Sequence, residues 1–312
     1  MTTPQLPISS HRNQVLDVDG LQLPDLEGAR AIVTPHATWT LSGFGDEIDP
    51  DPAVQVAVLS ALGARHIEVR SAWRTNVVDL DDAQVEKLRA ILTEAGFGVS
   101  AVASPIGKVD VSLDAEHEVR RLRRVIRVAQ ALGTTGIRIF SFFRADGLTP
   151  GDIRDEVLVR MRLLADEAER EGVVLLHENE KDIYGDTPGR VLDIVESVGS
   201  SALRLAWDNA NFVQVGVRPY SDGFAMLRPY VDYLQVKDAL AATGEVVPAG
   251  EGDGELRETL SALHDSGYSG FASLEPHLAE GHALGGFSGP RAFGTAARAF
   301  ARLTGELGIE VA

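Results

Sequence analysis

Four polar residues each close an apolar, β-rich segment in the second half of the chain. They are Glu178 in "LLHENE", Asp208 in "LAWDNAN", Gln235 in "YLQVKD" and Glu275 in "SLEPH". In a parallel α/β protein, residues at the carboxyl ends of neighbouring strands meet at one edge of the sheet. Three carboxylates placed together repel one another and raise one another's pKa unless a positive charge lies among them. A divalent cation is an economical source of that charge, and the Gln235 carbonyl oxygen is an acceptable neutral fourth ligand.

Strand alternation selects Glu178 from the run of polar residues around it. Every other residue of a barrel strand points inward, so Glu178 shares its face with Leu176, whereas His177 belongs to the opposite face. Small inward residues precede the other two carboxylates: Ala206 before Asp208 and Ser273 before Glu275. For any one carboxylate the alternative is a structural role, as a helix cap or as the partner of a lysine.

The elements that must position these residues follow a βαβα rhythm that begins near Trp39. The strand candidates are "TLSGFGDEI", "RHIEVRS", "GVSAVASP", "GIRIFSFF", "GVVLLHEN", "LRLAWDNAN", "VDYLQVKD" and "GFASLEPH". The helix candidates between them include residues 51–63, 81–96, 115–133 and 154–172. Eight consecutive units without a break in composition favour a closed (β/α)8 TIM barrel, as a single domain over residues 39–312, over an open doubly wound sheet.

Two segments stand outside this rhythm. Residues 1–38 are rich in proline and weakly periodic, so we expect an N-terminal arm or cap, with a disordered tail as the alternative. The insertion "AATGEVVPAGEGDGEL" follows the seventh strand, where a barrel carries active-site loops. Because its glycine-rich part is acidic, we expect a mobile lid or a spacer there and not a phosphate-binding loop.

Composition excludes several classes of partner. With 46 acidic and 29 basic residues the formal charge is −17, which repels nucleic acid and anionic membranes. No apolar run approaches the roughly 20 residues that span a bilayer. The absence of cysteine leaves only oxygen and imidazole ligands for a metal. The N-terminus lacks the features of a signal peptide, so we expect a cytoplasmic location.

At these motifs the sequence resembles the sugar phosphate isomerase/epimerase family of xylose isomerase-like TIM barrels. The motifs that carry the resemblance are "SGFGDEI", "IEVR", "ASPIGKVD", "IRIFSF", "LLHENEKDIYGDT", "WDNANF", "VKDA", "PAGEGDG" and "SLEPHL". The resemblance implies a metal held by Glu178, Asp208, position 235 and Glu275. It also implies that a substrate carbonyl and hydroxyl bind the metal, and that Glu178 and Glu275 act as an acid/base pair on an enediolate.

Position 235 departs from the family pattern, which usually has His in "HxKD" where this chain has Gln235. A glutamine keeps an oxygen donor but loses the affinity of imidazole for softer metals. We therefore expect weaker binding and a bias toward Mn²⁺, with Mg²⁺, Co²⁺ and Zn²⁺ as the other ions considered. Loss of the metal and of activity is the alternative outcome of this change.

Five further residues are predicted to hold the substrate. They are Glu68, Arg70, Lys108, Lys237 and His277, all at or just after strand ends. A structural Arg70–Glu68 ion pair and a loop role for His277 are the alternatives. The expected substrate is a small carbohydrate. The sequence leaves open whether the chain assembles into a homo-oligomer.

Other activities share parts of this site. A lyase that cleaves 3-oxo-glycosides, including C-glycosides, by β-elimination would use the same first proton removal. Endonuclease IV-like DNA repair uses the same fold with a histidine-rich zinc cluster, which the acidic composition argues against. A non-catalytic sugar-binding barrel is the last alternative.

Overall fold

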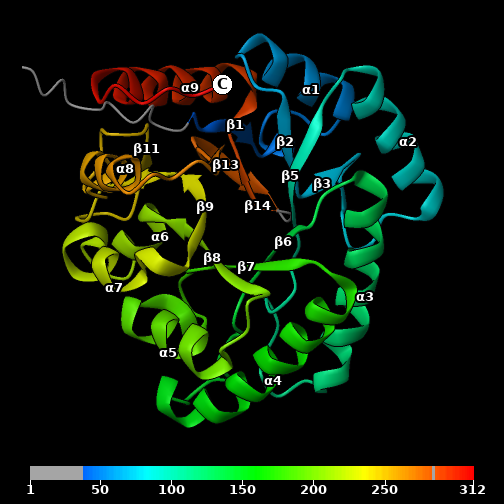
Figure 1. Cartoon of the computed structure of the whole chain (residues 1–312), viewed down its shortest axis with the longest axis vertical. Coiled ribbons are helices and arrows are strands. Elements are labelled where there is room, and N and C mark those ends of the chain that lie inside the picture. Colours follow the sequence, from blue (N-terminus) through cyan, green and yellow to red (C-terminus); the bar gives the residue numbers. More distant parts are fainter. Residues whose placement is uncertain (1–37, 283–284) are drawn as a thin grey trace, which may run out of the picture. The chain divides into compact units, whose positions relative to one another are not determined.

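The computed structural model describes residues 38–282 and 285–312, and within them eight parallel strands form one sheet that curves into a barrel (Figure 1). The order of the strands around the sheet is β1-β12-β9-β8-β7-β6-β5-β2. A parallel bridge between Phe44 and Glu68 joins the two end strands and nearly closes the barrel. The strands are β1 (Thr40–Gly43), β2 (His66–Val69), β5 (Gly98–Ala103), β6 (Gly136–Ile139), β7 (Val174–Glu178), β8 (Leu203–Asp208), β9 (Val231–Val236) and β12 (Phe271–Leu274).

Helices cover the outside of this barrel and complete the expected (β/α)8 architecture (Figure 1). They are α1 (Pro52–Ala61), α2 (Asp82–Glu94), α3 (Ala115–Leu132), α4 (Pro150–Glu171), α5 (Pro188–Val198), α6 (Asn209–Val213), α7 (Ala225–Leu227), α8 (Leu256–Asp265) and α9 (Gly289–Glu306). The sequence pattern placed the start of α4 four residues too late. The helix begins after Thr149, because the side chains of Thr149 and Asp152 cap it reciprocally.

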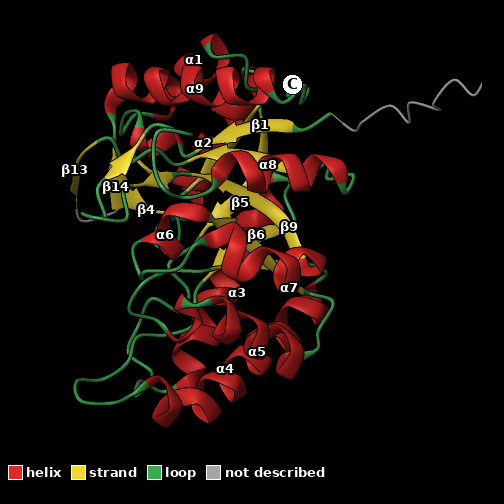
Figure 2. Ribbon diagram, turned by 90° about the vertical axis from the view of Figure 1, so that its left-hand side faces the viewer, coloured by secondary structure: helices red, strands yellow, loops and turns green. Residues whose placement is uncertain are grey.

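Several short elements lie at the ends of the barrel. Three small antiparallel pairs follow barrel strands: β3 (Ser71–Ala72) with β4 (Thr75–Asn76), β10 (Asp238–Ala239) with β11 (Val246–Val247), and β13 (Ala279–His282) with β14 (Gly285–Phe287). Figure 2 shows β13 and β14 side by side at one end of the barrel. Helical turns η1 (Gly45–Glu47), η2 (Tyr184–Asp186), η3 (Pro219–Phe224) and η4 (Arg228–Tyr230) complete the described elements.

The two faces of the strands pack against different layers, as alternation requires. Leu176, Ala206, Ala101 and Tyr233 pack together as one small cluster, separate from the large core between sheet and helices. His177 points away from this small cluster and toward η2. Its ring is so close to Gly185 of η2 that a Cβ added there would lie 2.5 Å from it. The inward face of β7 is therefore the one that ends in Glu178.

The predicted N-terminal arm lies almost wholly outside the described residues. Between residues 38 and 312, as far as the structure describes them, no helix is both long and apolar enough to cross a membrane.

Candidate active site

The structure brings three of the strand-end carboxylates together. Glu178 ends β7, Asp208 ends β8 and Glu275 follows β12, and one oxygen of each lies within 4.8 Å of the others. All three side chains are buried. Gln235 of β9 is in register with Asp208 on one side and with Ser273 on the other, so it belongs to the same layer. The arrangement is a deep acidic site at the carboxyl ends of the strands.

Gln235 is the most unusual member of this layer. Its side chain is fully buried, and neither its amide oxygen nor its amide nitrogen has a hydrogen-bond partner within residues 38–282 and 285–312. Buried polar groups are nearly always paired, because leaving one unpaired costs free energy. An unpaired amide beside three carboxylates fits the donor set of a hard divalent cation, which prefers oxygen ligands.

Cationic side chains already neutralise the three carboxylates. Lys237 Nζ lies 2.8 Å from Asp208 Oδ2 and 2.9 Å from Glu275 Oε2. Arg138 Nη1 lies 2.6 Å from Glu178 Oε2. Repulsion among the carboxylates is therefore not by itself an argument for a metal ion, because Lys237 and Arg138 supply positive charge. The case for a metal depends on the Gln235 amide and on the convergence of oxygen donors.

The same contacts set the charge of the carboxylates. Burial raises the pKa of Asp208 to about 7, against the opposing effect of Lys237. Burial would also raise the pKa of Glu275, but Lys237 and His277 together hold it well below its usual range. Glu275 is thus an anion at neutral pH, whereas burial makes Asp208 easier to protonate than an exposed aspartate.

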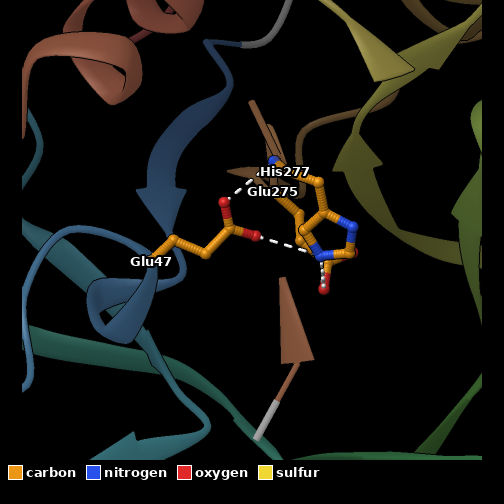
Figure 3. Close-up of side chains that lie close together, drawn as sticks. All are labelled: Glu47, Glu275 and His277. Carbon is orange, nitrogen blue, oxygen red and sulfur yellow. Dashed lines mark hydrogen bonds and ion pairs between the residues drawn. The ribbon is translucent and has the colours of Figure 1, made fainter. Parts of the chain in front are cut away.

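A second cluster joins Glu275 to η1, the helical turn after the first strand (Figure 3). His277 Nε2 lies 3.1 Å from Glu47 Oε1 and 3.3 Å from Glu275 Oε1. The other oxygen of Glu47 accepts from the backbone N–H of His277 and from the hydroxyl of Ser288, both at 2.9 Å. Burial opposes charge on the imidazole, yet the Glu47 and Glu275 carboxylates raise the pKa of His277 to about 9. His277 is therefore a cation held between two carboxylates.

Backbone geometry fixes the position of this imidazole. His277 has a left-handed backbone, with φ of 44°, which is strained for a residue with a side chain. Its ring packs directly on Gly286 of β14, where an added Cβ would lie 1.7 Å from His277 Cδ2.

Arg70 Nη2 donates to the Gly286 carbonyl at 2.8 Å, and its Nε donates to Asp46 at 2.9 Å. Arg70 Nη1 also contacts Glu275 Oε1 at 3.3 Å. Arg70 therefore pairs with Asp46 and Glu275, and not with Glu68 as the structural alternative had it.

A cavity of about 80 Å³ opens above these groups. Four of the predicted substrate-binding residues line it: Arg70, Lys108, Lys237 and His277. Glu178 and Glu275 also line it, together with Arg138, Phe140 and Glu180. Lys108 stands over the Phe140 ring at 4.3 Å and pairs with Glu180 at 2.9 Å.

Glu68 does not line the cavity. It lies in the barrel interior, where the Tyr233 hydroxyl donates to its carboxylate at 2.9 Å. Burial, opposed mainly by Arg138, raises the pKa of Glu68 to about 8. The structure thus places Glu68 in the packed interior rather than among the substrate-facing residues.

Three site residues were missed by the sequence reasoning. Glu47 follows the first strand in "GDEI", where the strand-end rule could have found it. Arg138 is a charged residue inside the apolar run "GIRIF", which signals an inward position with a buried partner. Asn211 donates to Glu178 Oε1 at 2.8 Å, but its place in the short helix α6 gave no signal of its own.

The glycine-rich loop is anchored and not a free lid. Four backbone N–H groups donate to the Asp238 carboxylate, from Ala239, Gly250, Gly252 and Gly254. Gly252 has no room for a side chain, since an added Cβ would lie 2.4 Å from Asp238 Oδ1. The loop amides therefore bind an internal carboxylate immediately after Lys237.

Fold and site together define a (β/α)8 barrel with an acidic centre at its strand ends. The chain belongs to the xylose isomerase-like TIM barrel family, whose model matches residues 56–302. It is 30% identical over 220 residues to 2-epi-5-epi-valiolone 7-phosphate 2-epimerase of Actinoplanes sp., covering 70% of this chain and 79% of the relative.

Two further relatives widen the comparison. The 3-dehydroshikimate dehydratase of Bacillus anthracis is 25% identical over 186 residues, which cover 54% of this chain and 65% of the relative. A xylose isomerase-like TIM barrel protein from Mycobacterium smegmatis, solved in complex with magnesium, shares the fold with a TM-score of 0.61 and 22% identity, covering 87% of this chain and 96% of that one. Relatives of this chain thus include an epimerase and a dehydratase, so an enzyme is indicated.

Proposed function

We propose that the protein is a divalent metal-dependent isomerase or epimerase of a keto-sugar or a related polyol-derived ketone. The observation that carries the proposal is the unpaired, buried Gln235 amide beside three converging carboxylates. The similarity to a 2-epimerase of a cyclic ketone phosphate supports the reaction class.

The residues that would hold the ion are Glu178, Asp208, Gln235 and Glu275. Because all four offer oxygen, we expect Mn²⁺ or Mg²⁺ in preference to the softer ions. When bound, the ion would polarise the substrate ketone and stabilise the negative charge that develops on its oxygen.

The chain itself supplies the proton transfers. One of Glu178 and Glu275 accepts the proton from the carbon next to the ketone, and the C–H electron pair moves into the adjoining carbonyl. The other returns a proton to the opposite face, which inverts that carbon, or to the neighbouring carbon, which exchanges aldose and ketose. Arg138 and Asn211 hold the Glu178 carboxylate by one oxygen each, and this fixes its orientation.

Cations on the cavity wall would orient the substrate. Arg70, Lys108, Lys237 and His277 face the space above the carboxylates. Each can donate to a hydroxyl or to an anionic group, and the phosphate in the name of the Actinoplanes relative makes a sugar phosphate a natural probe.

Solvent exchange tests the proposal. The full chain, supplied with Mn²⁺ in D₂O, is incubated with 2-epi-5-epi-valiolone 7-phosphate and with a panel of ketohexoses and their phosphates. We expect deuterium at the carbon next to the ketone together with an epimer or aldose, and a loss of rate of about 10²–10⁴-fold in Glu178→Gln. The exposed Glu196→Gln is the matched control and keeps the wild-type rate. Exchange that survives both in Glu178→Gln and in Glu275→Gln would contradict the assignment.

An elimination is the second candidate, favoured by the similarity to 3-dehydroshikimate dehydratase. The same proton removal next to a ketone can expel a β-leaving group instead of being reversed. Incubation with 3-dehydroshikimate and with 3-oxo-glycosides separates the two, because loss of water or release of an aglycone marks the lyase. Deuterium incorporation without a leaving group marks the epimerase.

A further inference from the structure

Lys237 stands between the cavity and the deepest part of the site. It lines the cavity, whereas Asp208 and Gln235 are absent from the described cavity wall and are fully buried. The lysine side chain is only 3% exposed. A cation that reaches Asp208 and Gln235 from the cavity must therefore pass the ammonium group.

The ammonium also uses the oxygens that a metal would need. Asp208 Oδ1 accepts from the backbone N–H of Asn211 at 2.9 Å, and Glu275 Oε1 faces Arg70 and His277 at 3.3 Å each. The remaining oxygens, Asp208 Oδ2 and Glu275 Oε2, are the two that Lys237 contacts. A metal ion that binds either of these two oxygens therefore competes directly with the ammonium group.

Among the cations that contact the three carboxylates, Lys237 has the most mobile side chain. The Arg138 guanidinium lies over the Phe140 ring at 4.4 Å and over the Phe44 ring at 5.7 Å, which holds its plane. Lys237 carries a compact charge on a flexible stem. Glu180, at the cavity wall, is a further carboxylate that attracts the Lys237 ammonium, in addition to Asp208, Glu275 and Glu178.

We propose that Lys237 is an internal counter-ion that competes with the divalent cation for Asp208 and Glu275, and that binding of the cation displaces its ammonium toward the cavity. This inference rests on the metal dependence proposed above and adds a determinant of metal affinity. The displaced ammonium remains at the cavity wall, so metal binding releases one of its hydrogen-bond donors from the carboxylates for contact with the substrate. Metal and substrate then bind in a coupled manner.

Manganese binding tests this role without any substrate. The full chain is freed of metal with EDTA and titrated with MnCl₂, and the free ion is followed by its electron paramagnetic resonance signal. We expect Lys237→Met to bind Mn²⁺ at least about tenfold more tightly than the wild type, equivalent to about 1.4 kcal/mol. Lys108→Met removes a charge from the same cavity wall but not from the carboxylate cluster, so its affinity should stay within about threefold of the wild type.

The outcomes separate this inference from the proposed function. Wild-type binding with no tightening in Lys237→Met, or equal tightening in Lys108→Met, overturns the lysine role and leaves the metal site standing. No Mn²⁺ binding by any of the three proteins overturns the metal dependence and the lysine role with it.

A wild-type measurement covers the case in which Lys237→Met fails to fold. In a crystal structure of the wild type at saturating MnCl₂, we expect Lys237 Nζ to have left at least one of the two oxygens that it contacts at 2.8 Å and 2.9 Å. A bound ion with both lysine contacts intact refutes the displacement.

Discussion

The buried Glu68 gives a prediction that depends on no substrate. Its carboxyl lies in the barrel interior, and burial raises its pKa to about 8 from an ordinary value of 4.5. Between these two values the unfolded chain has released the Glu68 proton, whereas the folded chain retains it. The free energy of unfolding therefore falls as the pH rises through this window. Replacing Glu68 with Gln, which is neutral at every pH and can still accept from Tyr233, should remove this part of the pH dependence.

The size of the effect follows from the two pKa values. One pKa unit corresponds to about 1.4 kcal/mol, so the full difference between 4.5 and about 8 amounts to at most about 5 kcal/mol. The advantage of Glu68→Gln over the wild type should be near its minimum at about pH 5 and should grow by a few kcal/mol by about pH 8.

Urea denaturation of both proteins at several pH values in this range measures the difference. Comparing the variant with the wild type at each pH cancels the contribution of the other acidic groups, and the exposed Glu196→Gln is the matched control, which should show no trend. A constant difference between Glu68→Gln and the wild type from about pH 5 to about pH 8 would show that Glu68 ionises normally in the fold.

Gln235→His should raise the affinity for Zn²⁺ and Co²⁺ relative to Mn²⁺, because imidazole favours softer ions; competitive titration measures the ratio, and an unchanged ratio would place position 235 outside the metal site. Glu47→Gln should lower the free energy of unfolding by about 1–3 kcal/mol, because the Glu47 carboxylate that binds His277 and Ser288 is buried. Urea denaturation measures this loss, and a variant as stable as the wild type would contradict it. Gly252→Ala should cost about 1–3 kcal/mol by crowding Asp238, whereas Gly151→Ala, whose added Cβ meets only the Thr149 hydroxyl at 3.8 Å, is the control that should lose much less.

The barrel and the inward register of its strands could be predicted from the sequence because both depend on local periodicity. Alternation along β7 is enough to separate Glu178 from His177, and Leu176 and Ala206 indeed share the small interior cluster. The convergence of the strand-end residues follows from the architecture, since parallel strands of one barrel end at one face.

The partners of these residues could not be predicted in the same way. Whether Lys237 reaches Asp208, Glu275 or the solvent depends on the path of a flexible side chain across neighbouring strands. Arg138 and Glu47 lie far in sequence from Glu178 and Glu275, so no local pattern pairs them. The charge balance of the site depends on these long-range contacts, so the sequence does not show that Lys237 and Arg138 supply positive charge to the carboxylates.

The proposed metal site can be tested in a crystal structure of the wild type with Mn²⁺ and a keto-sugar, in which the anomalous signal of manganese locates the ion. We expect manganese bound by Glu178, Asp208, the Gln235 carbonyl oxygen and Glu275, with Glu178 and Glu275 on opposite sides of the carbon next to the ketone. Manganese bound elsewhere, or a sugar carbon that neither carboxylate approaches, would contradict it.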